Sequence, residues 1–159
     1  MAVLIRGRTK CLLCGEVIGE DDEVVSFTPF VGNPRDPLYR YSDGIFHASH
    51  FWQQPDADRA MARWNEVRQH TAPDQRRCAV CAEIIGDPDD YIGFGFLADD
   101  GPASAFNYVH LHRSHLGSWA KLGEAIQAIQ SLGSSGQWES QDLEATIDLL
   151  RDAQRNGLN

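Results

Sequence analysis

The chain has 159 residues, 42% of them apolar, so it can fold as one domain or as two small ones. Its formal net charge is -9 and its pI is near 5.0, the opposite of the basic footprint that phosphate contacts require. Nucleic acid is therefore disfavoured as the main partner, whereas an acidic surface suits solubility or a basic protein partner. No stretch reaches the roughly 18 apolar residues of a membrane span, and the apolar run in 1–10 is too short for a signal peptide. We expect a cytoplasmic location.

The first motif along the chain is a C-x-x-C pair, Cys11 and Cys14, followed by Gly15. Two cysteines at this spacing sit on a tight turn where both sulfur atoms converge, and glycine eases such a turn. The next segment, "EVVSFTPFV" at 23–31, is β-rich, and "GNPRDP" forms a turn cluster. Apolar residues then roughly alternate in "LYRYSDGIF" at 38–46. These segments predict a β-hairpin.

A helix is predicted from His47, and His50 follows three residues later, so both imidazoles would lie on one face of its first turn. Pro55 interrupts this helix, and Asp56 can cap a continuation over 57–69. The apolar stripe of that continuation consists of Met61, Trp64 and Val67 or Arg68.

The second half of the chain repeats the first. The segment "CAVCAEIIGDPDDYIGF" at 78–94 aligns without gaps to "CLLCGEVIGEDDEVVSF" at 11–27, with a constant offset of 67 residues. Further along, "LHRSHL" at 111–116 matches "FHASHF" at 46–51 with an offset of 65. A two-residue length difference therefore falls between the cysteines and the histidines, where a loop can absorb it. Residues 70–77 are predicted to form an exposed linker between the halves.

The remaining elements follow from the same patterns. A strand at 91–98, a turn at 99–104 and a second strand at 105–111 lead into a helix from His112 to about Leu132. After a loop at 133–138, Ser140 can cap a last helix that ends near 156–157. This helix carries Leu143, Ile147 and Leu150 and has no counterpart in the first half. It would either close the gap between the halves or offer an apolar face to a partner.

The doubled cysteine and histidine pattern predicts two structural Zn²⁺ sites, one in each half. Two thiolates and two neutral imidazoles complete a tetrahedron and leave no open position. The expected ligands are Cys11, Cys14, His47 and His50 in the first site, and Cys78, Cys81, His112 and His115 in the second. Three alternatives stay open. The cysteines and histidines could be ordinary core residues, which leaves the doubled spacing to chance, or the C-x-x-C pairs could have a redox role, which leaves the histidines unexplained. In the third, cross-pairing, the two cysteine pairs share one ion and the two histidine pairs another. An all-histidine structural site is uncommon, which favours one site in each repeat.

A knuckle, a hairpin and a helix that supplies the second ligand pair resemble the treble-clef class of zinc fingers. The resemblance covers residues 11 to about 69 and 78 to about 132. It implies an α+β fold of two tandem treble-clef-like modules plus a C-terminal helix. The expected domains are 1–72, 73–134 and 135–159.

Other chemistry-bearing residues are expected to be structural. His110 is interpreted as a structural histidine rather than a replacement ligand. Glu16 and Glu83, at matching knuckle positions, have no activated water to serve as general bases. The four tryptophans are expected to fill the core, namely Trp52, Trp64, Trp119 and Trp138.

The favoured function is a non-catalytic, zinc-stabilised protein-binding module, an inhibitor or adaptor for a basic partner. One alternative is a zinc-dependent nuclease of the HNH type, although Asn107 and His110 do not form its pattern. A zinc deaminase would need His-x-Glu, which the chain lacks. A nucleic-acid-binding zinc finger is disfavoured by the charge. No membrane or small-molecule substrate is expected.

Overall fold

The computed structural model describes residues 3–138 and 141–157. The chain is an α+β protein, as predicted, and contains two two-stranded antiparallel sheets. It divides into two compact units. The first comprises the residues up to Gly32 together with Asp36–Arg68, and the second comprises Asn33–Arg35 and the residues from Gln69 onward.

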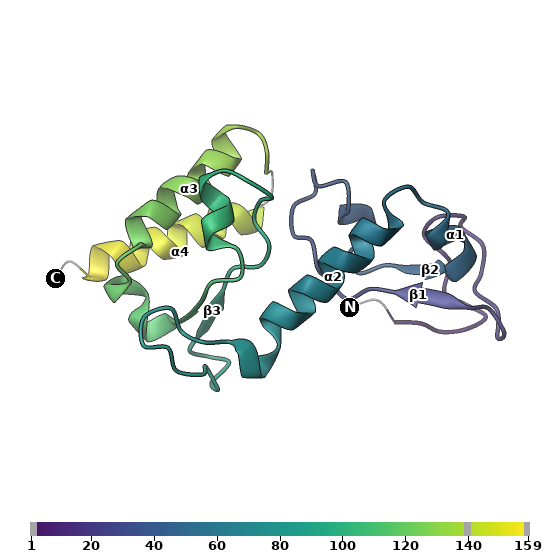
Figure 1. Cartoon of the computed structure of the whole chain (residues 1–159), viewed down its shortest axis with the longest axis horizontal. Coiled ribbons are helices and arrows are strands. Elements are labelled where there is room, and N and C mark those ends of the chain that lie inside the picture. The colour runs from purple at the N-terminus through teal and green to yellow at the C-terminus, as the bar shows by residue number, and fades with distance from the viewer. Residues whose placement is uncertain (1–2, 139–140, 158–159) are drawn as a thin grey trace. The chain divides into compact units, whose positions relative to one another are not determined.

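The first unit is built on a hairpin of β1 (Val24–Ser26) and β2 (Ile45–His47), in which Val25 lies opposite Phe46. The two strands lie side by side in Figure 1. The predicted hairpin is confirmed, but its connection is longer than expected. The middle of "LYRYSDGIF" forms a short 3-10 helix, η1 (Tyr39–Tyr41), and only the end of this segment is strand.

Two helices follow β2: α1 (Ala48–Trp52) and α2 (Ala57–Thr71), of which α2 lies in the first unit as far as Arg68. The break between them contains Pro55, as predicted, because proline has no backbone N–H to donate and so interrupts a helix. The predicted stripe on α2 packs against the core through half-buried side chains, namely Met61, Trp64 and Val67. The core itself is aromatic, because the rings of Phe46 and Phe51 contact each other and each also contacts the rings of Phe27 and Tyr41.

The second unit repeats this order of elements. After a short turn of 3-10 helix, η2 (Pro73–Gln75), strand β3 (Tyr91–Gly93) pairs antiparallel with β4 (His110–His112). A 3-10 helix, η3 (Pro102–Phe106), lies in their connection, where the first unit has η1. Most of the predicted linker is exposed to solvent, although the first part of it continues α2.

The prediction of one continuous helix from His112 to about Leu132 is wrong. The structure has a 3-10 helix, η4 (Arg113–Ser118), then a break, then α3 (Leu122–Ser134). Trp119 lies in the break with extended backbone, and its buried ring contacts the rings of Phe94 and Phe106. Burial of this large ring overrides the helical periodicity of the sequence.

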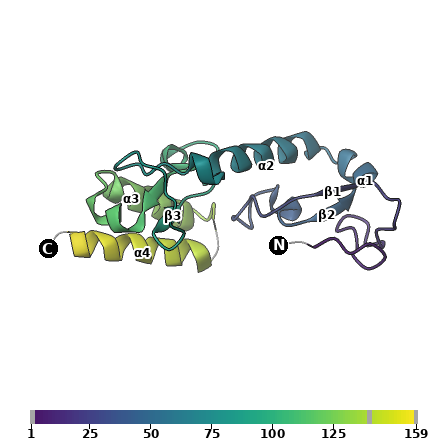
Figure 2. The same ribbon diagram turned by 90° about the horizontal axis from the view of Figure 1, so that it is seen from below.

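The last helix, α4 (Gln141–Gly157), packs on α3 and on η4. Figures 1 and 2 both show α3 and α4 side by side. Its predicted apolar residues face the core of the second unit: Leu143 and Leu150 are buried, and Ile147 packs against them in part. The predicted cap, Ser140, lies outside the described residues. Among the described helices, none is long and apolar enough to cross a membrane.

Candidate metal centres

Each C-x-x-C pair forms a knuckle closed by the same two backbone hydrogen bonds. In the first, the N–H of Cys11 donates to the carbonyl of Glu16 (2.9 Å), and the N–H of Gly15 donates to the carbonyl of Cys11 (2.8 Å). In the second, Cys78 donates to Glu83 (2.9 Å) and Ala82 donates to Cys78 (2.8 Å). The backbones of Glu16 and Glu83 therefore close the two turns.

The final residue of each knuckle has a left-handed backbone, with φ of 77° at Gly15 and 63° at Ala82. Glycine adopts this conformation freely, whereas alanine is strained in it. The second knuckle therefore accepts a backbone penalty that the first avoids.

The two histidines of each pair come from different elements. His47 ends β2 and His112 ends β4, whereas His50 lies in α1 and His115 in η4. The helix was expected to begin at the first histidine, but it begins one residue later in both units. At this junction the N–H of each strand-end histidine donates to a cysteine sulfur: His47 to Cys11 Sγ and His112 to Cys78 Sγ, both at 3.4 Å. The junction thus places the histidines directly over the knuckle.

The eight residues expected as ligands gather into two groups of four. In each group, one donor atom from every residue lies within 4.8 Å of the others. The groups are Cys11, Cys14, His47 and His50, and Cys78, Cys81, His112 and His115. Each cysteine pair therefore meets the histidine pair of its own repeat. The alternative in which the two cysteine pairs share one ion and the two histidine pairs another is therefore wrong.

The separations between sulfur and nitrogen atoms fit tetrahedral coordination. Bond lengths of about 2.3 Å to sulfur and about 2.05 Å to nitrogen give a sulfur–nitrogen edge of about 3.6 Å in a tetrahedron. Cys14 Sγ lies 3.5 Å from His47 Nδ1, and Cys81 Sγ lies 3.6 Å from His112 Nδ1. Cys78 Sγ is likewise 3.6 Å from His115 Nδ1. The residues present therefore fit a tetrahedral metal ion.

A buried nitrogen in the first group points to the same conclusion. His50 Nδ1 is buried and has no hydrogen-bond partner among the described residues. A buried polar atom without a partner costs about 1–3 kcal/mol. Coordination of a metal ion would satisfy this atom.

The cysteine environments favour one thiolate in each group. Burial acts to raise the pKa of the Cys11 thiol, but hydrogen bonds from the N–H groups of Cys14, His47 and Leu13 outweigh it and lower the pKa to about 6. The same balance lowers the pKa of Cys78 to about 6, with N–H donors that include His112 and Cys81. The lowered pKa favours the thiolate of each residue, and the thiolate is the form of cysteine that binds a metal ion.

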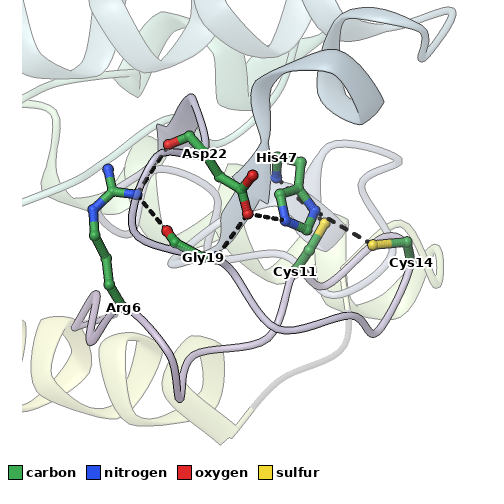
Figure 3. A network of polar contacts seen from close by, with 6 residues as sticks. All are labelled: Arg6, Cys11, Cys14, Gly19, Asp22 and His47. Carbon is green, nitrogen blue, oxygen red and sulfur yellow. Dashed lines mark hydrogen bonds and ion pairs between the residues drawn. The ribbon is translucent and has the colours of Figure 1, made fainter.

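Asp22 supports the first group from outside it. Its Oδ2 atom lies 3.1 Å from His47 Nε2 and accepts the N–H of Gly19 at 2.6 Å. Figure 3 shows that Asp22 points at the imidazole, while the Arg6 guanidinium reaches the carbonyls of Gly19 and Asp22. The Gly19 N–H lowers the pKa of Asp22 most, and the His47 side chain lowers it further.

The second group is supported differently. The Asp90 carboxylate accepts the N–H of Ser114 at 2.8 Å and its hydroxyl at 3.0 Å, so it caps the turn between the two histidines. These bonds, led by the Ser114 N–H, lower the pKa of Asp90. The sequence repeat does not indicate that the two groups are supported by different aspartates, because Asp22 aligns with Asp89 and not with Asp90.

Two residues considered for a nuclease are engaged in structural contacts. His110 is buried and contacts the Tyr91 hydroxyl through Nδ1 (3.0 Å) and the His70 carbonyl through Nε2 (2.9 Å). The Asn107 amide accepts the N–H groups of Leu97 (2.7 Å) and Ala98 (3.2 Å). It also donates to the carbonyl of Ala98 (2.8 Å). Neither residue belongs to the two donor groups.

The tryptophan prediction is correct for only part of the set. Trp119 and Trp138 are buried, and Trp64 is half-buried with its Nε1 donating to Thr28 Oγ1 at 3.1 Å. Trp52 is 51% exposed, so it is not a core residue. Trp52 is the last residue of the short α1, and its ring contacts that of the buried Phe51.

Comparison of the chain with protein-family models, with curated proteins and with solved structures gives no significant match.

Proposed function

We propose that each donor group holds one Zn²⁺ and that both ions are structural, within modules of the treble-clef type. The observation that supports this most directly is the pair of Cys₂His₂ groups with tetrahedral sulfur–nitrogen separations. Thiolate and imidazole ligands in a tetrahedral arrangement favour zinc, whereas calcium and magnesium prefer oxygen ligands. Four protein ligands fill the coordination shell, so neither ion has a position for water or substrate.

Structural zinc suits the size of these units. A unit of this size buries a modest core, and small folds commonly need a metal or a disulfide. All four cysteines are free, so no disulfide supplies this stabilisation. Zinc binding can contribute about 10–16 kcal/mol of apparent free energy at neutral pH, which is enough to hold such modules folded.

The proposed role of this scaffold is to bind another protein, as an inhibitor or adaptor for a basic partner. The net charge of -9 supports a basic partner, because opposite charge accelerates encounter and suppresses wrong partners. Acidic side chains of the turns, such as those of Asp87 and Asp89, are exposed to solvent. Several apolar side chains are also exposed to solvent and would be buried at an interface with a partner, namely Leu12, Val17 and Trp52.

Metal analysis of the purified chain tests the first half of the proposal. We expect two zinc ions per chain, with loss of cooperative folding when a strong chelator removes them. Calcium and magnesium should not restore the fold, whereas added Zn²⁺ should. A chain that is folded without metal would contradict the proposal.

Capture of partners from extract of the source cell tests the second half. The bait is the zinc-loaded chain, and a matched bait carries His47→Ala and His50→Ala. We expect a basic protein that binds only the intact bait, and whose purified form binds directly with an affinity that falls as salt rises. Tight binding of labelled DNA or RNA at physiological salt, or a hydrolytic activity lost in the matched variant, would contradict a protein-binding role.

A further inference from the structure

We propose that Asp22 is a positioning residue for His47, and that it makes the first metal site retain its ion longer than the second. This inference rests on the proposed zinc sites. It concerns a difference between two sites that are built from the same ligand types in the same order.

The contact to Asp22 determines which nitrogen of His47 faces the metal site. A carboxylate can only accept hydrogen bonds, so the Nε2 atom at 3.1 Å from Asp22 Oδ2 must carry the ring proton. The lone pair then lies on Nδ1, which faces Cys14 Sγ at 3.5 Å. A carboxylate on the outer nitrogen of a metal-bound imidazole fixes its tautomer and orientation and raises its basicity.

The surrounding loop holds Asp22 in this place. The same Oδ2 atom accepts the Gly19 N–H at 2.6 Å, and a Cβ atom at Gly19 would lie only 3.2 Å from it. The Arg6 guanidinium donates to the carbonyls of Gly19 (2.7 Å) and Asp22 (3.0 Å) and so joins both ends of the loop. Figure 3 shows this chain of contacts from Arg6 to His47.

The second repeat lacks the arrangement, although an aspartate stands at the aligned position. A Cβ atom at Gly86 would meet nothing within 4 Å, so no carboxylate covers this glycine. Here the N–H of Asp89 donates to the Asp87 side chain at 2.9 Å, across Pro88, and this turn directs the loop differently. Pro73 occupies the position of Arg6 and has no guanidinium to offer.

Among the described residues, the second site therefore has no carboxylate hydrogen-bonded to the ring of its strand-end histidine, although the charge of Asp90 interacts with His112. Within residues 3–138 and 141–157, neither Asp89 nor Asp90 hydrogen-bonds the ring of His112. Asp90 holds the backbone and hydroxyl of Ser114 instead. Loss of a contact of the Asp22 kind typically costs about 10- to 100-fold in metal affinity. We expect a difference of that size between the two sites.

Zinc release from the full-length, fully loaded chain into excess chromophoric chelator tests the inference. We expect two kinetic phases, the slower one from the first site. Asp22→Ala should accelerate the slow phase by about 10- to 100-fold and leave the fast phase unchanged. Asp22→Asn keeps an oxygen acceptor for Gly19 but lacks the charge, so it should give an intermediate acceleration. The matched control, Asp89→Ala, should leave both phases unchanged.

Nitrogen-15 NMR of the imidazoles gives a readout that loop stability alone would not change. The Nε2 proton of zinc-bound His47 should exchange slowly with water in the wild type and rapidly in Asp22→Ala, with His112 unaffected. Equal release rates from both sites, or an unchanged slow phase in both Asp22 variants, would overturn the inference and leave the zinc sites standing. A chain that binds no zinc would overturn both.

Discussion

The backbone around the donor groups has the same conformation in both units. The units differ in how deeply the helix that follows the donor group is buried, α2 in the first and α3 in the second. Left-handed residues occur at equivalent places in both, such as Asp43 and Tyr108, each with a φ of 57°. The N–H of Ile18 donates to the Thr9 carbonyl, and that of Ile85 to the Arg76 carbonyl, both at 2.9 Å. The chain thus builds the same local frame twice, from sequences that differ at most positions.

A pair of unlike residues shows how the frame is reproduced. In the first unit the Ser42 hydroxyl accepts the N–H groups of Phe30 (2.9 Å) and Val31 (3.1 Å) and donates to the carbonyl of Val31 (3.1 Å). In the second, the Asn107 amide makes the same three bonds at the aligned positions. A hydroxyl and an amide are interchangeable here because each can both accept and donate.

The helices behind the frame differ more. On α3 the apolar stripe is buried, through Ile126, Ile129 and Leu132, and α4 packs on that helix. The aligned stripe of α2 is only half-buried, and the described part of the first unit has no helix equivalent to α4. We infer that the first unit depends more on its metal site for stability, and the second more on apolar packing.

Removal of one histidine pair should give the largest contrast between the units. In His47→Ala with His50→Ala, the first unit should lose the proposed zinc ion, which contributes about 10–16 kcal/mol of apparent free energy, and should unfold. In His112→Ala with His115→Ala, the second unit also loses its ion, but the packing of α3 and α4 should preserve part of its helix content. Zinc stoichiometry and amide NMR spectra of both variants measure this. Equal loss of structure in both units would contradict the inferred difference.

Truncation of Leu150 tests the apolar side of the contrast. Leu150 lies on α4 and is fully buried in the second unit. Leu150→Ala should lower the free energy of unfolding of this unit by about 2–5 kcal/mol. Val67→Ala, on the half-buried stripe of α2, is the matched control and should cost about 1 kcal/mol. Chemical denaturation of the zinc-loaded variants, followed separately in each unit, measures both effects.

Loss of the loop-holding side chains should have a smaller and more equal effect. Ser42→Ala and Asn107→Ala each leave two backbone N–H groups without their side-chain acceptor, at a cost of about 1–3 kcal/mol. Each variant should destabilise only its own unit, as measured by thermal unfolding. The swap variants Ser42→Asn and Asn107→Ser test the equivalence. A swap as harmful as alanine would show that the two loops require their own residues.

The donor groups were predictable from the sequence because the ligand spacing is a short-range pattern and because it occurs twice. The spacing of Cys11 and Cys14 defines a turn, and the repeat at Cys78 and Cys81 shows that the spacing is not accidental. The pairing of the hairpin strands and the α2 stripe follow from short-range patterns in the same way. The predicted strands at 91–98 and 105–111 are too long, because β3 and β4 have three residues each and η3 occupies the start of the second predicted strand. Pro55 marks the end of α1 because its effect on a helix does not depend on the tertiary fold.

Features that depend on tertiary contacts were not predictable. The break at Trp119 arises because its ring is buried against Phe94 and Phe106, residues distant in sequence. The exposure of Trp52 likewise reflects where α1 ends relative to the core. The role of Asp22 depends on the path of one loop, which the aligned Asp89 does not share.

The final position of each knuckle should give the smallest effects, and they should have opposite signs. Gly15 and Ala82 both adopt a left-handed backbone, and a Cβ at Gly15 would meet no atom within 4 Å. Gly15→Ala should therefore cost only the conformational penalty of about 1 kcal/mol, and Ala82→Gly should relieve a similar penalty in the second unit. The more flexible unfolded chain of the glycine variant offsets part of that gain. Thermal unfolding of the zinc-loaded single variants measures both shifts, and the double variant should lie near the wild type. Destabilisation by Ala82→Gly would show that the second knuckle is not strained, and that the two frames differ at the turn where they look most alike.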